Sequence, residues 1–255
     1  MTIGLLFSRR WLLTTFLVLV GVAVCIRLGF WQLDRLEQRR TFNAHVQDMR
    51  SLPPLDLNQT SNFSDITRME YRAAIARGRY DYEAQVALRN QYYEGQYGYH
   101  LLTPLLLDNQ IAILVDRGWI PAEGNASPVD WRKYDEPTEI IAVRGILRLG
   151  HPQRTPENSA AHLDFWMFVD LEKIGKQIPY LILPAYLQLD PQERTTPPIP
   201  YQPTLDLSEG PHLGYAIQWF TFAAILLFGY PVYVRKQEEH PPNALPSEKS
   251  NGHKC

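Results

Sequence analysis

Cysteine is nearly absent from this 255-residue chain, which contains only Cys25 and Cys255. The first lies inside an apolar run, and the second is the final residue of a polar tail. The long segment between them therefore cannot form a disulfide, a CxxC redox pair or a thiolate metal site. Thiol-based redox and metal chemistry are excluded from the centre of the chain.

The chain also lacks an excess of positive charge. It has 25 Lys and Arg against 27 Asp and Glu, a formal net charge of −2. Nucleic-acid binding requires a basic surface, so we expect no nucleic-acid partner. The sequence shows no nucleophile with a paired base, no Gly-rich phosphate loop and no histidine spacing typical of a metal site. We therefore expect a protein that is not an enzyme.

Two long apolar runs stand near the ends of the chain. The first has no charge from Trp11 to Ile26, and the second has no formal charge from Leu213 to Val234. At 1.5 Å per residue, twenty helical residues span roughly 30 Å, the thickness of the hydrocarbon core. A cleaved signal peptide is the competing interpretation of the first run, but Val24 stands where a small residue is needed. Both runs predict transmembrane helices embedded in a lipid bilayer.

Positive charges flank both runs on the terminal side. Arg9 and Arg10 precede the first run, and Arg235 and Lys236 follow the second. The positive-inside rule then places both termini in the cytoplasm and the middle of the chain outside, although arginines beyond the first run weaken its own signal. The ten residues before the first run do not resemble an Arg- and Ser-rich presequence. We therefore predict a multi-pass protein of the bacterial inner (plasma) membrane with a periplasmic central domain.

The middle of the chain has the pattern of an α+β domain. A helical pattern continues past the first run as an amphipathic stalk, and Pro53-Pro54 end it. Short β-branched and aromatic runs follow, with a hairpin around Asp108-Asn109, a helix at 171–177 and an extended connector at 195–203. The predicted strands cover 71–80, 84–90, 99–107, 111–120, 139–149, 166–169 and 185–189.

The predicted fold class is thus a membrane protein with two transmembrane helices flanking one mainly antiparallel-β extracytoplasmic domain. The Pro-, Glu-, Ser- and Lys-rich tail has too little apolar content to fold. The expected segments are a cytoplasmic N-terminus (1–10), transmembrane helix 1 (11–30), the stalk (31–50), the extracytoplasmic domain (51–211), transmembrane helix 2 (212–234) and a disordered cytoplasmic tail (235–255).

Five short motifs are spread along the chain in a fixed order, inside this two-helix topology. They are Gly29 to Arg35; Tyr71-Arg72 with Gly78 to Tyr80; Gly98-Tyr99 with Thr103 to Leu105 and Val115 to Pro121; Val143 to Arg148; and His212 to Phe220. Together they resemble the Surfeit locus protein 1 family of cytochrome c oxidase assembly factors.

The resemblance implies a factor that helps to assemble haem-copper cytochrome c oxidase while haem a is inserted into its catalytic subunit. It also implies transient binding of haem a, and as partners that catalytic subunit and other assembly factors. A membrane scaffold that never touches haem is the main alternative. A copper chaperone is disfavoured by the missing cysteines and the four methionines. A membrane-anchored enzyme is disfavoured because no catalytic constellation is present.

His212 is the sharpest candidate for a cofactor site. It follows Gly210-Pro211 at the outer end of the second run, where a neutral imidazole can bind a haem iron axially. Tyr215 and Trp219 lie at i+3 and i+7, on the same helical face, as an aromatic wall. The alternative is an interfacial histidine within an aromatic belt. The resemblance favours the ligand, because the family's haem binding centres on this histidine.

Arg27, Trp31 and Arg35 fall at i, i+4 and i+8 on one face of the first helix. Such a stripe suits the propionates of haem or acidic lipid headgroups, through charge-assisted hydrogen bonds. Side chains that snorkel to the membrane surface are the commoner explanation.

The run Asp116-Arg117-Gly118-Trp119 invites a catalytic interpretation, but a structural one fits better. We expect an Asp–Arg pair, a glycine with unusual backbone angles and a buried tryptophan that closes a hairpin.

Overall fold

The computed structural model describes residues 3–60, 63–107, 111–137, 139–152, 162–191 and 196–239. The chain divides into two compact units. The helical unit comprises residues 1–43 and 207–255, and the β unit comprises residues 44–206.

The helical unit contains α1 (Ile3–Leu6), most of α2 (Leu12–Ser51) and α5 (His212–Glu239). α2 is continuous across the predicted boundary between span and stalk, and it ends just before Pro53-Pro54. α5 continues through Pro231, although proline usually kinks or ends a helix. Residues 235–239, predicted to belong to a disordered tail, are therefore helical, and residues 240–255 lie outside the described part of the chain.

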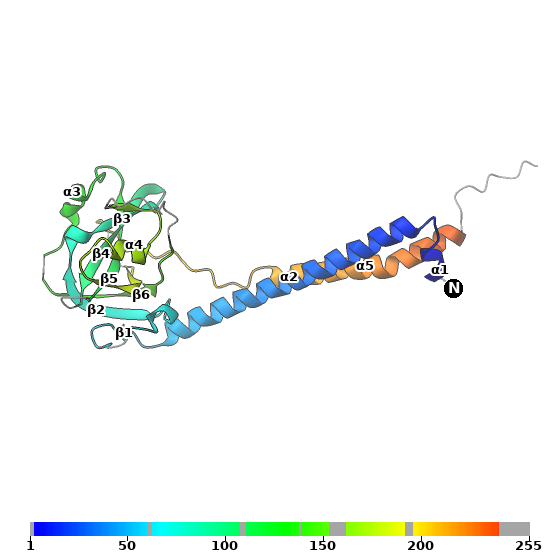
Figure 1. Cartoon of the computed structure of the whole chain (residues 1–255), viewed down its shortest axis with the longest axis horizontal. Helices are drawn as coiled ribbons and strands as arrows, with labels where there is room; N and C mark the ends of the chain where they lie inside the picture. The colour runs from blue at the N-terminus through cyan, green and yellow to red at the C-terminus, as the bar shows by residue number, and fades with distance from the viewer. Residues whose placement is uncertain are drawn as a thin grey trace, which may run out of the picture. The chain divides into compact units, whose positions relative to one another are not determined.

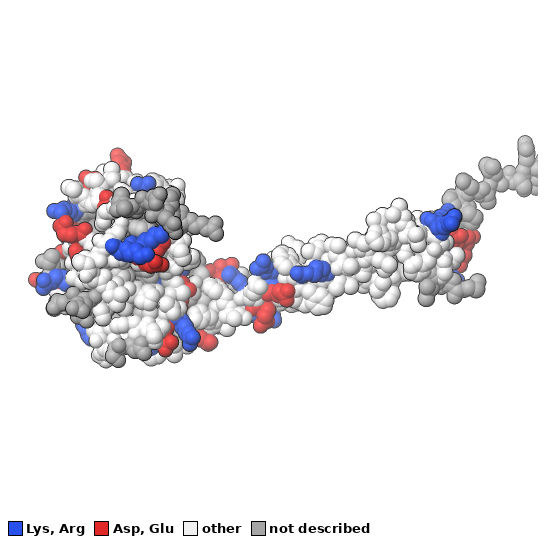
Figure 2. Space-filling model, viewed as in Figure 1, with Lys and Arg blue, Asp and Glu red and all other residues white. Residues whose placement is uncertain are grey.

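α2 and α5 run side by side in opposite directions (Figure 1). Val22 and Cys25 of α2 pack against Ala223 of α5, and small side chains of this kind let two helices approach closely. Near the start of α2, the hydroxyl oxygens of Thr15 and of Tyr230 on α5 lie 2.8 Å apart. Both helices are long and apolar enough to cross a membrane. Figure 2 shows uncharged surface along the middle of the pair, with charged side chains gathered toward its ends.

The β unit holds strands in all the predicted regions, with ends shifted by a few residues, and one further strand, β1. The antiparallel pairing of β4 with β5 confirms the predicted hairpin, whose turn at 108–110 is not among the described residues. The strands are β1 (Leu55–Asp56), β2 (Ala73–Tyr80), β3 (Val86–Tyr93), β4 (Gln96–Leu106), β5 (Ile111–Pro121), β6 (Ile141–Arg148), β7 (Phe165–Trp166) and β8 (Leu181–Leu189). The short helices are α3 (Pro128–Trp131), α4 (Leu171–Gly175) and the 3-10 turns Ile66–Arg68, Tyr82–Ala84 and Arg132–Tyr134.

The sheet closes on itself. Its strand order is β1-β2-β6-β8-β5-β4-β3-β7, and β2 pairs in addition with β4. Strands β2, β6, β8, β5 and β4 therefore form a five-stranded barrel, with the remaining strands attached at its seam. The pairs β1–β2, β3–β7 and β5–β8 are parallel, and the others are antiparallel, which confirms the mainly antiparallel prediction.

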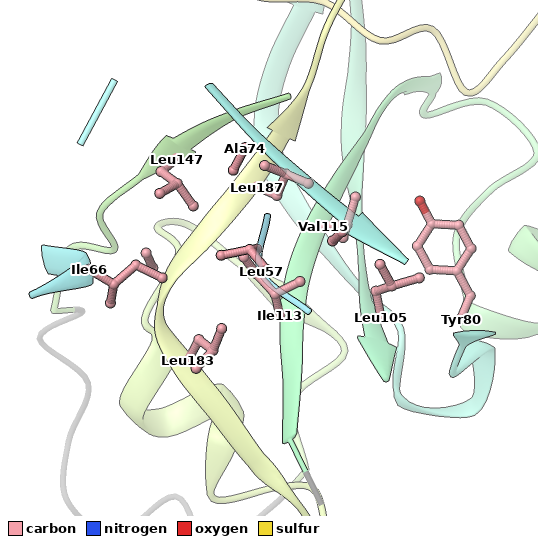
Figure 3. Close-up of a cluster of buried hydrophobic side chains, with 12 residues drawn as sticks. Leu57, Ile66, Ala74, Tyr80, Leu105, Ile113, Val115, Leu147, Leu183 and Leu187 are labelled. Carbon is pink, nitrogen blue, oxygen red and sulfur yellow. The ribbon is translucent and has the colours of Figure 1, made fainter. Parts of the chain in front are cut away.

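The barrel interior is filled with side chains. Alternate residues of each strand point to one face of a sheet, so Ala74, Ala76 and Tyr80 of β2 face Ile113 and Val115 of β5. Figure 3 shows the side chains of Ala74, Ile113 and Val115 among leucines from the other strands. Burying a Leu, Ile or Val side chain stabilises a fold by about 1.5–3 kcal/mol. The interior is therefore a packed core and does not form a channel.

The connector that leaves the barrel is held at its middle. The backbone N–H groups of Trp119 and Ile199 each donate to the other residue's carbonyl, both at 2.8 Å. Gly118, beside this contact, has φ +120°, and a Cβ there would lie 2.3 Å from the carbonyl carbon of Ile199. Glycine is therefore required where the connector crosses β5. This confirms the unusual backbone angles expected for Gly118.

The predicted Asp116–Arg117 pair is wrong. Successive residues of a strand point to opposite faces, so these two side chains diverge. Both oxygens of Asp116 contact Nδ1 of His100, at 3.0 and 2.9 Å, and both residues are almost fully buried. Arg117 instead donates to Oε1 of Gln85 at 3.0 Å and lies against the ring of Tyr80. Asp116 and Arg117 thus make hydrogen bonds on opposite faces of the barrel wall.

Candidate functional site

His212 is the first residue of α5, and its ring meets α2. Its Nδ1 lies 2.9 Å from Oε1 of Gln32, and both side chains are half-buried. Among the described residues, no hydrogen bond engages the other ring nitrogen, Nε2. A Cβ at Gly210 would lie 3.5 Å from this Nε2, so the glycine leaves the edge of the ring clear. The arrangement presents one imidazole nitrogen to a ligand while the other is held.

The chain just before α5 is fastened to α2 by a polar clamp formed by Arg40, Asn43, Leu207 and Glu209. Arg40 donates to both carboxylate oxygens of Glu209, at 2.8 and 2.9 Å. These hydrogen bonds hold the pKa of Glu209 below its ordinary value. Nδ2 of Asn43 donates to the carbonyl oxygen of Leu207 at 2.6 Å. The clamp fixes where α5 begins along α2.

On the other side of His212, the two helices meet closely at a glycine. A Cβ at Gly29 would lie 2.6 Å from the ring of Phe220, so only glycine admits this ring without displacement. Phe220 also packs edge-on against Phe30, with ring centroids 5.4 Å apart. The position of His212 is therefore fixed from both directions along the helix pair.

The two aromatic residues expected around His212 share a face of α5 but differ in their packing. Trp219 packs against the contact between Val22, Cys25 and Ala223, whereas Tyr215 is 48% exposed. The ring of Trp219 pairs edge-on with Phe222, and within the part of the chain that the structure describes no ring–ring pair joins either residue to His212.

The predicted stripe on α2 remains on the open face of that helix. Arg27 is exposed, and Trp31 is 40% exposed beneath the guanidinium of Arg35, which lies 5.6 Å from the ring centroid. Arg35 also donates to Oε1 of Gln38 at 2.9 Å. Across the described ranges, no hydrogen bond or ring contact joins this stripe to His212.

Gln32 is the site residue that the sequence reasoning missed. It lies inside the first motif, but no role was predicted for it. The signal that could have found it is spacing, because Gly29, Gln32 and Leu36 recur at helical intervals on one face of α2. Gly29 and Leu36 are buried, so a glutamine between them is a polar group on the packed side.

The β unit offers weaker candidates. A hollow of about 360 Å³ is lined in part by His151, Met167 and Tyr186, and one of about 260 Å³ is lined in part by Arg117 and Glu136. No group of three metal-ligating side chains occurs among the described residues. We therefore take His212, with one ring nitrogen held and the other without a hydrogen bond among the described residues, as the candidate ligand.

Comparisons with known proteins agree with the motifs. The model of the SURF1 family matches residues 19–224. A SURF1-like protein of Rickettsia bellii is 28% identical over 233 residues, covering 87% of this chain and 91% of that protein. An uncharacterised SURF1-like protein of Mycobacterium tuberculosis is 24% identical over 260 residues (97% and 93%), and one of Drosophila melanogaster is 26% identical over 236 residues (84% and 74%). The chain belongs to the SURF1 family.

Proposed function

We propose that this chain is a non-enzymatic assembly factor for haem-copper cytochrome c oxidase that holds haem a transiently during its insertion into the catalytic subunit. Family membership implies the coarser role, in assembly of the oxidase. The observation that supports the finer one is Nε2 of His212, which has no hydrogen bond among the described residues and is kept clear by Gly210. Imidazole nitrogen is a common axial ligand of haem iron.

The haem would supply the iron to be delivered, and the chain's own residues would bind and orient it. His212 would be the iron ligand. Arg27 and Trp31 on α2, with Tyr215 and Trp219 on α5, would hold the propionates and the apolar ring edge. Binding through one contact from each of these residues suits a transient carrier, which must release the haem to the oxidase.

We place the protein in the bacterial inner membrane, with α2 and α5 crossing the bilayer and the β unit in the periplasm. The antiparallel pair supports two termini on one side. Nε1 of Trp11, just before α2, donates to Oε1 of Glu238, near the end of α5, at 2.9 Å. The positive charges beside these ends favour the cytoplasm for both. In this arrangement the β unit faces the partners, namely the oxidase catalytic subunit and other assembly factors.

His212→Ala should abolish the haem a carried by the purified protein. The chain would be produced in a host that synthesises haem a, purified in detergent, and its haem measured by absorption spectroscopy and extraction. We expect close to one haem per wild-type chain and almost none in the variant. His162→Ala, at an exposed position of the β unit, is the matched control and should keep its haem. Wild-type protein without haem would favour the scaffold that never touches haem.

A further inference from the structure

We propose that Gln32 is a positioning residue for His212, which fixes the imidazole in the tautomer whose Nε2 is free to bind iron. The inference rests on the proposed function, because it assigns a role to a second residue of the same site. Gln32 itself would not touch the haem.

The direction of the hydrogen bond follows from the chemistry of the two groups. The oxygen of the Gln32 amide carries no proton and only accepts hydrogen bonds. At 2.9 Å, Nδ1 of His212 must therefore be the donor and carry the proton. In a neutral imidazole, the lone pair then lies on Nε2. An iron ion binds this lone pair, so the contact selects the tautomer that can act as a ligand.

The contact also sets the direction in which Nε2 points. A hydrogen bond at Nδ1 holds the plane of the ring, and such partners of metal-binding histidines orient the ring and raise its basicity. Gly210 leaves space beside Nε2, since even a methyl group there would lie within 3.5 Å. The ring is thus held on one edge and open on the other.

The helix pair keeps Gln32 opposite His212. Gly29, one turn before Gln32, receives the ring of Phe220, and the polar clamp at Arg40 and Asn43 lies about two to three turns beyond it. A slide of one turn between the helices would break all three contacts together. A half-buried amide and imidazole also favour mutual hydrogen bonding, because an unpaired buried polar group is costly.

Two substitutions separate this role from simple packing. Gln32→Met keeps the length of the side chain but removes the acceptor, and Gln32→Glu keeps the shape and strengthens the acceptor. We expect haem a to bind roughly 10–100-fold more weakly to Gln32→Met, the usual cost of losing such a partner. Gln32→Glu should keep its affinity and lower the midpoint potential of the bound haem, because a more basic ligand favours ferric iron.

The controls distinguish failure of this inference from failure of the proposed function. Gln47→Met, at an exposed position of α2, should match the wild type in affinity and potential. If His212→Ala loses haem but both Gln32 variants keep wild-type affinity and potential, the positioning role is wrong and the haem site stands. Nitrogen NMR of the haem-free protein gives an independent readout. It should show the proton of His212 on Nδ1, and a proton on Nε2 would overturn the inference even without haem.

Discussion

Asp116→Asn should lower the free energy of unfolding of the β unit by about 3–5 kcal/mol at about pH 6, the usual cost of removing one partner from a buried charge pair. Asp116 is 4% exposed and His100 is 5% exposed. Water therefore cannot solvate the charged imidazole of His100 once the carboxylate is removed. Asparagine has nearly the same shape and can still accept the N–H of Gly118, as Asp116 does at 3.1 Å. The loss therefore reports the charge and not a cavity. Denaturation of the full chain in detergent, followed by tryptophan fluorescence, measures it.

The effect should depend on pH. Burial lowers the pKa of His100, but the charge of Asp116 and its hydrogen bond outweigh burial, and the pKa is raised above 6.5. A raised folded-state pKa means that the stabilisation is complete below about pH 6.5 and is lost as the pH rises through the folded-state value. In Asp116→Asn, burial is the remaining effect on the pKa of His100, so this pKa falls below its ordinary value instead of rising above it. The difference in unfolding free energy between the two proteins should therefore shrink as the pH increases.

A second His–Asp pair provides the control. His162 and Asp164 lie 3.3 Å apart, but their side chains are 53% and 41% exposed. Exposed ion pairs contribute about 0–1 kcal/mol, so Asp164→Asn should lower the free energy of unfolding by no more than about 1 kcal/mol. Equal losses at the buried and exposed pairs would contradict the account.

Gly118→Ala should destabilise the β unit by roughly 3–5 kcal/mol. Two costs combine: a φ of +120° strains any residue with a Cβ, and overpacking adds about 1–3 kcal/mol. The overpacking is against backbone, because the new methyl would lie 2.3 Å from the carbonyl atoms of Ile199. The connector would have to leave β5. The same denaturation measurement, with proteolysis of the connector as a second readout, tests the prediction.

Gly124→Ala separates the two costs. Gly124 also has a positive φ, +70°, but a Cβ there would meet nothing within 4 Å. Its substitution should cost about 1–2 kcal/mol, the strain of a left-handed residue alone. If Gly118→Ala costs no more than Gly124→Ala, the close approach of Ile199 does not matter to stability.

Local patterns predicted the strands but not how they close. The β-branched and aromatic runs located β2 to β6 because each strand's own residues determine its alternation. Barrel closure depends on two residue pairs between β2 and β4 and on parallel pairing of β5 with β8. These contacts join segments far apart in the chain, and no local pattern specifies them. Asp116 shows the same limit, since its partner His100 comes from the neighbouring strand.

The candidate site was predicted in part. The position of His212 at the start of a helix follows from Gly210-Pro211 and the apolar run after them. Its partner Gln32 is 180 residues away in the chain, and only the register between α2 and α5 brings the two together. Helical spacing places Trp31 and Gln32 on different faces of α2, but which face meets α5 depends on packing at Gly29 and Phe220.

The most direct test of the proposed function is the haem a content of cytochrome c oxidase from cells that lack this chain. The catalytic subunit would be purified from such cells, and from cells given back the wild-type chain or His212→Ala. We expect a catalytic subunit poor in haem a without the chain, a full haem a content with the wild type and a low content with the variant. A full haem a content in cells that lack the chain would contradict the proposed role in haem insertion.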